Sequence, residues 1–332
     1  MPTPEERVKE FRRFFTAIEE EVGRVIVGQR AAVRKVLTAF FASGHVLIEG
    51  VPGLGKTLMV KSLSQALGLT FKRIQFTPDL MPSDIVGTQL LADSAGARHF
   101  EFKRGPIFAN IVLADEVNRA TPKTQSALLE AMEEQQVTVF GETHALDSPF
   151  FVLATQNPIE IEGTYPLPEA QLDRFLFKLI IQPPNSVELT EILARTTAGS
   201  RYQIRQVLPS DRAHLLVEEL KLLVREVLLA PPLGMYIARL IAAATPGTEQ
   251  GSIPEVTQYL RFGPGPRGAQ ALVLGAKVNA LLDNRVNVSF EDIADVTLPA
   301  LRHRCLLNFQ AEAENVTADQ IIDLLLKRIP KK

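Results

Sequence analysis

Residues 50–57 read Gly50-Val51-Pro52-Gly53-Leu54-Gly55-Lys56-Thr57, which has the form G-x-x-x-x-G-K-[ST]. An apolar run, residues 45–48, precedes this stretch, and a helical pattern over residues 58–67 follows it. A strand, a glycine-rich turn and a helix in this order are the setting that a phosphate-binding loop requires. The glycines let backbone N–H groups converge on phosphates, and the helix points the positive end of its dipole at them. The alternative is a glycine-rich turn followed by a chance Lys-Thr, which would have to reproduce both the pattern and its flanks.

The loop predicts a nucleotide site in which Lys56 reaches the β- and γ-phosphates and Thr57 places its hydroxyl on Mg²⁺. Upstream, Val27-Gly28-Gln29 closes an apolar segment between two helical patterns and is a candidate to wrap the adenine ring. Such a short run is a weak motif, and a simple loop is its alternative. The loop residues expected to contact the nucleotide are Gly50, Pro52, Gly53, Leu54, Gly55, Lys56, Thr57 and Leu58.

A second apolar run, residues 111–114, ends in Asp115 and Glu116. Four consecutive apolar residues indicate a strand that is covered on both faces, as in a parallel sheet. Ligands of α/β proteins bind at the carboxyl ends of such strands. We therefore expect Asp115 to hold Mg²⁺ through water and Glu116 to polarise the water that attacks the γ-phosphate. Taken alone, the segment reads equally well as a strand ending in a solvated acidic turn.

The next buried strand, residues 150–155, leads into Gln156-Asn157-Pro158. Because neighbouring parallel strands end at the same edge, we expect Asn157 to lie beside Glu116. There its amide would hold the attacking water and sense the γ-phosphate. An ordinary Asn-Pro turn is the alternative.

Strands and helices alternate as far as residue 181, where Pro183-Pro184 interrupts the pattern. The remainder of the chain reads as helical. We therefore expect a domain boundary near Pro184, with an α/β nucleotide-binding domain over residues 1–184 and a second domain over residues 185–332.

Two predicted hairpins interrupt the first domain. One covers residues 88–102, with its turn at Asp93-Ser94-Ala95-Gly96, and the other covers residues 137–146 around Gly141. Residues 79–84 have the composition of a turn.

Three further stretches accompany the phosphate loop: Asp115-Glu116-Val117-Asn118-Arg119-Ala120, Ala154-Thr155-Gln156-Asn157-Pro158 and Gly163-Thr164-Tyr165-Pro166-Leu167-Pro168-Glu169-Ala170-Gln171-Leu172-Asp173-Arg174-Phe175. Together these motifs resemble the AAA+ ATPases, in particular the MoxR family, in the group that also holds the magnesium chelatase ATPase subunit. The resemblance covers nearly the whole chain. It implies a P-loop NTPase αβα sandwich with a parallel sheet and inserted hairpins that project from a ring, together with an all-α lid domain. It also implies a homo-hexamer that binds ATP and Mg²⁺ between its subunits.

The resemblance assigns roles to arginines as well. Arg174 matches the arginine finger that one subunit donates to its neighbour's ATP, and a planar guanidinium suits a γ-phosphate with spread charge. A surface ion pair with Asp173 is the alternative. Arg267 matches the sensor arginine at the start of a lid helix, although Gly265 before its Pro-Arg pair is a mild departure from the family pattern. Arg119 serves either the subunit interface or a structural ion pair.

Composition narrows the classes of protein. The 332 residues carry a net charge of −2 with a pI near 6.3, so no nucleic-acid partner is expected, although local basic patches remain open. A single cysteine, Cys305, fits a reducing cytosol, and we expect a cytoplasmic protein. The N-terminus lacks the apolar core of a signal peptide, and no apolar run of roughly 18 residues predicts a membrane span.

Several other sites lack their signatures. The five histidines show no H-E-x-x-H spacing, so no zinc site is expected. The glycines around the loop do not form G-x-G-x-x-G, and no N-K-x-D occurs, which disfavours a dehydrogenase and a GTPase.

The resemblance implies an ATP-hydrolysing, chaperone-like ATPase that matures or remodels a partner protein, often one with a von Willebrand factor A-type domain. A metal-chelatase motor subunit shares the same insertions and is the first alternative. A nucleic-acid motor and a nucleotide-gated scaffold with negligible turnover are two others. Stimulation by a chelatase partner, salt-dependent stimulation by DNA, and a rate measurement would distinguish them.

Overall fold

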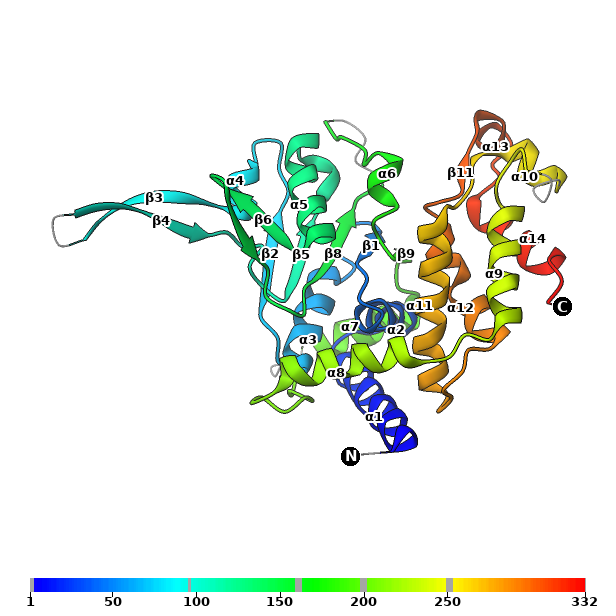
Figure 1. Cartoon of the computed structure of the whole chain (residues 1–332), viewed down its shortest axis with the longest axis horizontal. Coiled ribbons are helices and arrows are strands. Elements are labelled where there is room, and N and C mark those ends of the chain that lie inside the picture. Colours follow the sequence, from blue (N-terminus) through cyan, green and yellow to red (C-terminus); the bar gives the residue numbers. More distant parts are fainter. Residues whose placement is uncertain (1–2, 95–96, 159–162, 198–201, 249–252, 332) are drawn as a thin grey trace.

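The structure is a computed structural model that describes residues 3–94, 97–158, 163–197, 202–248 and 253–331. Figure 1 shows a sheet with helices on both faces and, beside it, a group of helices from the C-terminal part of the chain. A long hairpin extends from the sheet in the direction away from these helices.

Five parallel strands form the central sheet in the order β2-β5-β8-β1-β9. Within it, Val46 of β1 is aligned with Leu153 of β8 on one side and with Phe177 of β9 on the other. All five strands therefore begin at one edge, which we call the amino edge, and end at the opposite one, the carboxyl edge. The strands are β1 (Val46–Glu49), β2 (Phe71–Gln75), β5 (Ile111–Asp115), β8 (Phe151–Gln156) and β9 (Phe177–Ile180).

Both faces of the sheet are covered, which explains why its strands read as continuous apolar runs. Along β5, Ile111 and Leu113 pack in one hydrophobic cluster, while Val112 and Ala114 pack in a second cluster on the other face. The first cluster includes α1 (Pro4–Gly23), α2 (Arg30–Phe41) and α3 (Lys56–Leu67), and the second includes α5 (Pro122–Glu134). The predicted αβα sandwich is confirmed.

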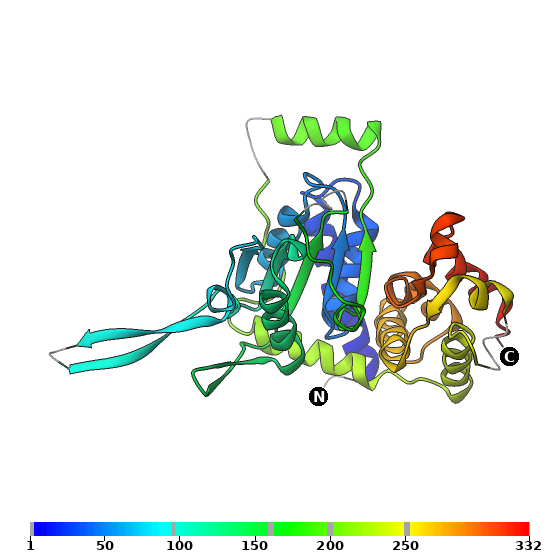
Figure 2. The same cartoon turned by 90° about the horizontal axis from the view of Figure 1, so that it is seen from above.

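Two antiparallel hairpins are inserted where the sequence predicted them, and the first is longer than expected. They are β3 (Gly87–Ser94) with β4 (Ala97–Arg104), and β6 (Gln136–Val139) with β7 (Glu142–Ala145). The first projects far from the sheet in Figures 1 and 2. Ala95 and Gly96 of its predicted turn lie outside the described residues.

The turn predicted over residues 79–84 is wrong in its second half, where the structure has a short helix, α4 (Pro82–Val86). Pro82 occupies the first helical position, where its missing N–H costs nothing. The Asp84 carboxylate accepts a hydrogen bond from the Met81 N–H at 2.8 Å, which satisfies a donor that precedes the helix.

After the Pro183-Pro184 break, α7 (Ser186–Thr197) stands apart from the sheet in Figure 2 and buries none of its described residues. Next, α8 (Ala213–Glu226) packs against α1 and α2. The helices that follow form the group beside the sheet: α9 (Pro231–Ala243), α10 (Pro254–Tyr259), α11 (Pro266–Leu282), α12 (Phe290–Leu301), α13 (Phe309–Ala313) and α14 (Ala318–Arg328). We call α9 to α14 the lid.

The lid is helical, as predicted, apart from one small feature. Two short strands, β10 (Leu260–Phe262) and β11 (Leu306–Leu307), pair in it, and the helical pattern gave no sign of them. None of the helices within the described residues is long and apolar enough to cross a membrane.

The lid packs directly on the sheet domain. The Gly275 position on α11 lies so close to β9 that an added Cβ would come within 2.8 Å of the Phe177 ring. Lys35 of α2 forms an ion pair with Asp295 of α12. Helices α1 and α2 also contact α11, so the lid and the sheet domain share one hydrophobic cluster.

Candidate functional site

The glycine-rich loop joins the carboxyl end of β1 to α3. Gly53 and Gly55 have φ angles of 85° and 77°, in the left-handed region that favours glycine. No heavy atom lies within 4 Å of the place where a Cβ would stand at either residue, so the loop is open to a ligand at these two positions. Gly55 is also the N-cap of α3, whose unsatisfied N–H groups favour an anion.

Lys56 is buried inside this loop. Its Nζ donates to the Gly50 carbonyl at 2.6 Å. Burial lowers the pKa of Lys56, while the nearby carboxylates of Asp115 and Glu116 act to raise it. The positive charge of Lys56 is thus held among backbone dipoles and two acidic groups, as expected for a residue that binds phosphates.

Asp115 ends β5 at the carboxyl edge, where two neighbouring strands orient its carboxylate. Thr155 of β8 donates to Oδ1 at 2.6 Å, and Arg73 of β2 donates to Oδ2 from Nε at 3.0 Å and from Nη2 at 2.7 Å. The sequence analysis did not identify either partner. They fix the direction of a carboxylate that was predicted to hold a metal ion through water.

Glu116 has a left-handed backbone conformation, with φ 58° and ψ 50°, which is strained for a residue other than glycine. Its N–H donates to the Thr155 hydroxyl at 2.8 Å, which helps to hold this conformation. Its Oε2 accepts from Gln75 Nε2 at 2.8 Å and from Arg119 Nη1 at 2.9 Å. Arg119 therefore has an ion-pair partner in its own chain, as its structural interpretation requires.

Asn157 is buried and directly follows β8, which lies between β5 and β1 in the sheet. It therefore lies at the carboxyl edge together with Lys56, Asp115 and Glu116, as predicted. No group of three or more His, Cys, Asp or Glu side chains able to hold a metal ion occurs in the described part of the chain. A hydroxyl and one carboxylate, from Thr57 and Asp115, nevertheless fit Mg²⁺, which usually takes few protein ligands and keeps waters and substrate phosphates.

The upstream segment Val27-Gly28-Gln29 reaches the same edge through the chain that leaves β9. The Gln29 side chain donates from Nε2 to the Gln182 carbonyl at 3.3 Å. The preceding residue, Ile181, lies against Gly50, where an added Cβ would be 3.2 Å from its carbonyl oxygen. Gly28 has a φ of 74° and lies against the Glu188 carboxylate of α7. The candidate base-binding segment is therefore next to the phosphate loop.

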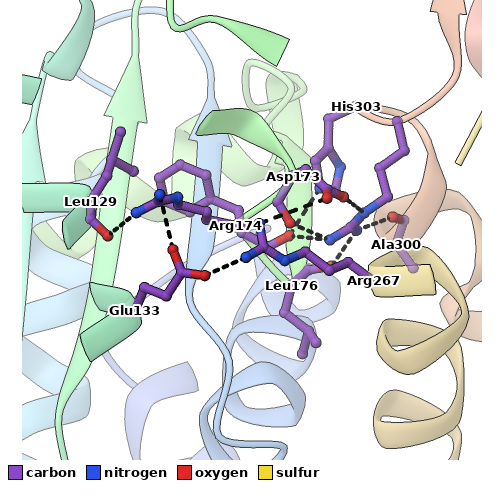
Figure 3. A network of polar contacts seen from close by, with 10 residues as sticks. Leu129, Glu133, Asp173, Arg174, Leu176, Arg267, Ala300 and His303 are labelled. Atoms are coloured by element: carbon purple, nitrogen blue, oxygen red, sulfur yellow. Dashed lines mark hydrogen bonds and ion pairs between the residues drawn. The ribbon is translucent and has the colours of Figure 1, made fainter. Parts of the chain in front are cut away.

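Arg174 and Arg267 lie together at the opposite, amino edge of the sheet (Figure 3). Arg174 follows α6 (Glu169–Leu172) and precedes β9, and it binds Glu133 of α5 with Nη2 and Oε2 2.9 Å apart. Arg267, in the first turn of α11, forms an ion pair with the same Glu133 and lies 3.9 Å from the Asp173 carboxylate. The expected start of a helix at Arg267 is confirmed.

The predicted alternative for Arg174, an ion pair with Asp173, is not what the structure shows. Asp173 accepts from Nε of Arg304 at 2.7 Å instead, and Arg174 also donates from Nη1 to the Leu129 carbonyl at 2.7 Å. A cavity of about 260 Å³ opens between the sheet domain and the lid at this place. Its polar lining includes Glu133, Asp173, Arg174, Arg267 and Arg304.

Reasoning from the sequence missed several residues at the carboxyl edge and at the amino edge. Arg73 and Gln75 occupy β2, where their positions opposite Leu113 and Asp115 depend on the register of two strands far apart in the chain. Glu133 carries no sequence signal beyond the polar face of a helix.

Comparisons with known proteins show the family and the fold of the chain. The sequence model of the ATPase family associated with various cellular activities (AAA) matches residues 45–177, and that of the AAA lid domain matches residues 255–325. The chain is 44% identical to the uncharacterized protein YeaC of Bacillus subtilis, over 93% of this chain and 92% of that protein. It is 41% identical to chaperone MoxR1 of Mycobacterium tuberculosis, over 93% and 80% of the two chains. A crystal structure of a "putative ATPase" from Cytophaga hutchinsonii superposes with a TM-score of 0.90 at 42% identity, covering 98% of this chain and 97% of that one.

Proposed function

The chain belongs to the MoxR family of AAA+ ATPases, and from that premise we propose that it hydrolyses ATP at the interfaces of a homo-hexameric ring. The free energy released would mature or remodel a partner protein in a chaperone-like way. A relative that is 41% identical carries the name chaperone, which supports this reading.

The proposal that the active site lies between two subunits rests on one observation. The groups suited to binding and cleaving a triphosphate lie at the carboxyl edge, whereas Arg174 and Arg267 lie at the amino edge. The four residues of β1 separate the edges by about 13 Å. The two arginines therefore face away from the phosphate loop of their own chain, and a second copy would supply its loop to them. Such head-to-tail contacts close into a ring when the rotation allows it.

Within the proposed site each residue has a distinct task. The loop N–H groups and Lys56 would bind the phosphates, and Thr57 and Asp115 would hold Mg²⁺, which supplies charge neutralisation at the phosphates. Glu116 would accept the proton of the attacking water, which Asn157 would orient. Gln75 and Arg119 both donate to Oε2 of Glu116, so Oε1 is the oxygen that would accept the proton of the water.

The neighbour's arginines would complete the site. A guanidinium placed at the γ-phosphate stabilises the charge that develops on its oxygens, and such fingers contribute about 10³- to 10⁵-fold to turnover in other phosphoryl-transfer sites. In the resting chain Glu133 occupies both arginines, so a phosphate has to replace this carboxylate.

The proposal extends to the organisation of the chain. We retain the boundary near Pro184, with a nucleotide-binding domain over residues 1–184 and a helical lid domain over residues 185–332, which comprises α7 and α8 in addition to the lid helices α9 to α14. The hairpin β3–β4, which extends far from the sheet, is suited to contact a client. A partner with a von Willebrand factor A-type domain and a cytoplasmic location complete the proposal.

Two substitutions test the nucleotide chemistry. Lys56→Ala should abolish ATP affinity, because the loop loses the charge that binds the β- and γ-phosphates. Glu116→Gln should retain ATP and stop turnover, because an amide cannot accept the proton of water. Equilibrium binding and steady-state hydrolysis distinguish the two. Normal hydrolysis by Glu116→Gln would show that another group is the base.

A mixing experiment tests the interfacial site. Arg174→Ala lacks the finger but keeps its own loop and Glu116, whereas Glu116→Gln keeps the finger but cannot hydrolyse ATP. Each variant alone should be inactive, and their mixture should regain turnover. Full activity of Arg174→Ala alone would refute the assignment of the finger. The stalled Glu116→Gln ring should also retain its client, which can be identified after co-purification.

A further inference from the structure

We propose that Arg304 of the lid is a positioning residue for the arginine finger, so that the lid of each protomer sets the place of Arg174 in the neighbour's site. This inference rests on the interfacial ATPase proposed above. It concerns the short segment Asp173–Leu176, which carries Arg174 between α6 and β9, and which we call the finger segment.

Arg304 forms hydrogen bonds along the whole finger segment. Its Nε donates to Asp173 Oδ1 at 2.7 Å, and its Nη2 donates to the carbonyls of Asp173 and Phe175, both at 2.9 Å. Its Nη1 donates to the Leu176 carbonyl at 3.2 Å and to the carbonyl of Ala300 in α12, the helix that ends three residues before Arg304. The planar, fork-shaped guanidinium is suited to several acceptors at fixed angles, which an ammonium group is not.

The neighbouring lid residue adds to the same contact. His303 is buried, and its Nε2 lies 3.0 Å from the Phe175 carbonyl. Burial and the charge of Arg304 lower the pKa of His303 well below its usual value, so the ring is neutral and Nε2–H is the donor. Two consecutive lid residues therefore bind the main chain on both sides of Arg174.

Burial makes this contact rigid. The Arg304 side chain is only 3% exposed, and Asp173 is the acidic partner that compensates its charge. Without the guanidinium, the carbonyls of the finger segment that it binds would lose their donor inside the protein, where water cannot take its place. Buried hydrogen bonds therefore hold the finger segment against the lid.

Arg304 also lies beneath the helix that carries the second arginine. An added Cβ at Gly268, the residue after Arg267, would lie 3.2 Å from Arg304 Cδ. Arg174 and Arg267 share Glu133 (Figure 3). Arg304 lies against the main chain next to each of these two arginines. A shift of the lid therefore moves both arginines together.

The mixing experiment can test this assignment in trans. The donor protomer, Glu116→Gln, supplies the finger, and the acceptor protomer, Arg174→Ala, hydrolyses ATP. Arg304→Lys in the donor should lower the maximal rate of the mixture about 10- to 100-fold, because a misplacement of about 1 Å costs up to 10²-fold. The KM for ATP should stay unchanged, since the acceptor's loop is intact. The same substitution in the acceptor, which has no finger to position, should leave the rate unchanged.

Matched variants separate positioning from folding. Arg302, two residues before Arg304, binds Asp319 at 2.7 Å and the Lys178 carbonyl at 3.2 Å but not the finger segment. A donor with Arg302→Lys should therefore still restore turnover in the mixture. Asp173→Asn weakens the Arg304 contact from its partly exposed side and should reproduce the donor-specific loss in a smaller degree. Melting curves and ATP affinity of each donor check its fold.

Two results would overturn the proposal. An equal loss of rate with Arg304→Lys in the donor and in the acceptor would indicate a general structural role. A donor that stays fully effective with Arg304→Lys would show that Arg304 does not position the finger. A failure of the unmodified mixture to turn over ATP is a different outcome, because it removes the interfacial site itself and this inference with it.

Discussion

Glu133→Gln is the substitution that asks most directly whether the chain restrains its own finger. One carboxylate on α5 binds Arg174 through Oε2 and Arg267 through Oε1. Glutamine keeps the shape of the side chain and removes the charge. We expect the variant to release both arginines for the neighbour's phosphate and therefore to raise basal ATP turnover.

The size of the effect follows from the exposure of the three side chains. Glu133 is 37% exposed, Arg174 31% and Arg267 41%, so solvent screens both ion pairs. Pairs of this kind contribute about 0.2–1 kcal/mol each, so their loss amounts to about 1 kcal/mol in total. Since about 1.4 kcal/mol corresponds to a factor of ten, turnover at subsaturating protein concentration should rise about fivefold. The folded state should lose no more than about 1 kcal/mol.

Steady-state ATPase measured against protein concentration, at low and high salt, is the suitable assay. The advantage of Glu133→Gln over the unsubstituted protein should shrink at high salt, because ions screen exposed pairs. Glu130→Gln removes the same charge one turn earlier on α5 and should not stimulate turnover. A fall in turnover with Glu133→Gln would refute the restraint and would show that Glu133 holds the arginines in their working position.

Two further predictions concern stability. His45 is buried, with its Nε2 at 3.2 Å from the Met132 carbonyl and its Nδ1 accepting from the Val152 N–H at 3.0 Å, and burial lowers its pKa to about 4. The unfolded chain therefore takes up the proton at a higher pH than the folded chain does. Unfolding titrations should show that the free energy of unfolding falls by about 3 kcal/mol as pH falls from about 6.5 to about 4. His45→Gln should reduce this loss. Gly275→Ala should lower the melting temperature, because its Cβ would meet the Phe177 ring and overpacking costs about 1–3 kcal/mol.

Much of the sheet domain follows from local sequence, because its signals are local. Residues 46–48 and 111–114 are apolar throughout since each strand is covered on both faces, and the glycines at 53 and 55 coincide with left-handed backbone. The common edge of Lys56, Asp115, Glu116 and Asn157 follows from parallel strands without further information.

The rest depends on pairs that are distant in the chain. β10 and β11 are three and two residues long and more than forty positions apart, so neither has a pattern of its own. Glu133, Asp173 and Arg304 meet at the amino edge because α5, α6 and α12 all end close to it. A charged residue on a helix or a turn is ordinarily predicted to be exposed to solvent. Nothing in the local sequence distinguishes these three residues from the exposed charged residues around them.

The parallel sheet itself has a consequence for how this chain works. β1 and β9 are adjacent and run in the same direction, so the loop that follows β1 and the finger segment that precedes β9 must lie at opposite edges. No movement of a side chain brings them together, because β1 and β9 separate them. In the proposed ring each chain therefore contributes half of two sites, and turnover per protomer must rise with protein concentration until the ring is complete.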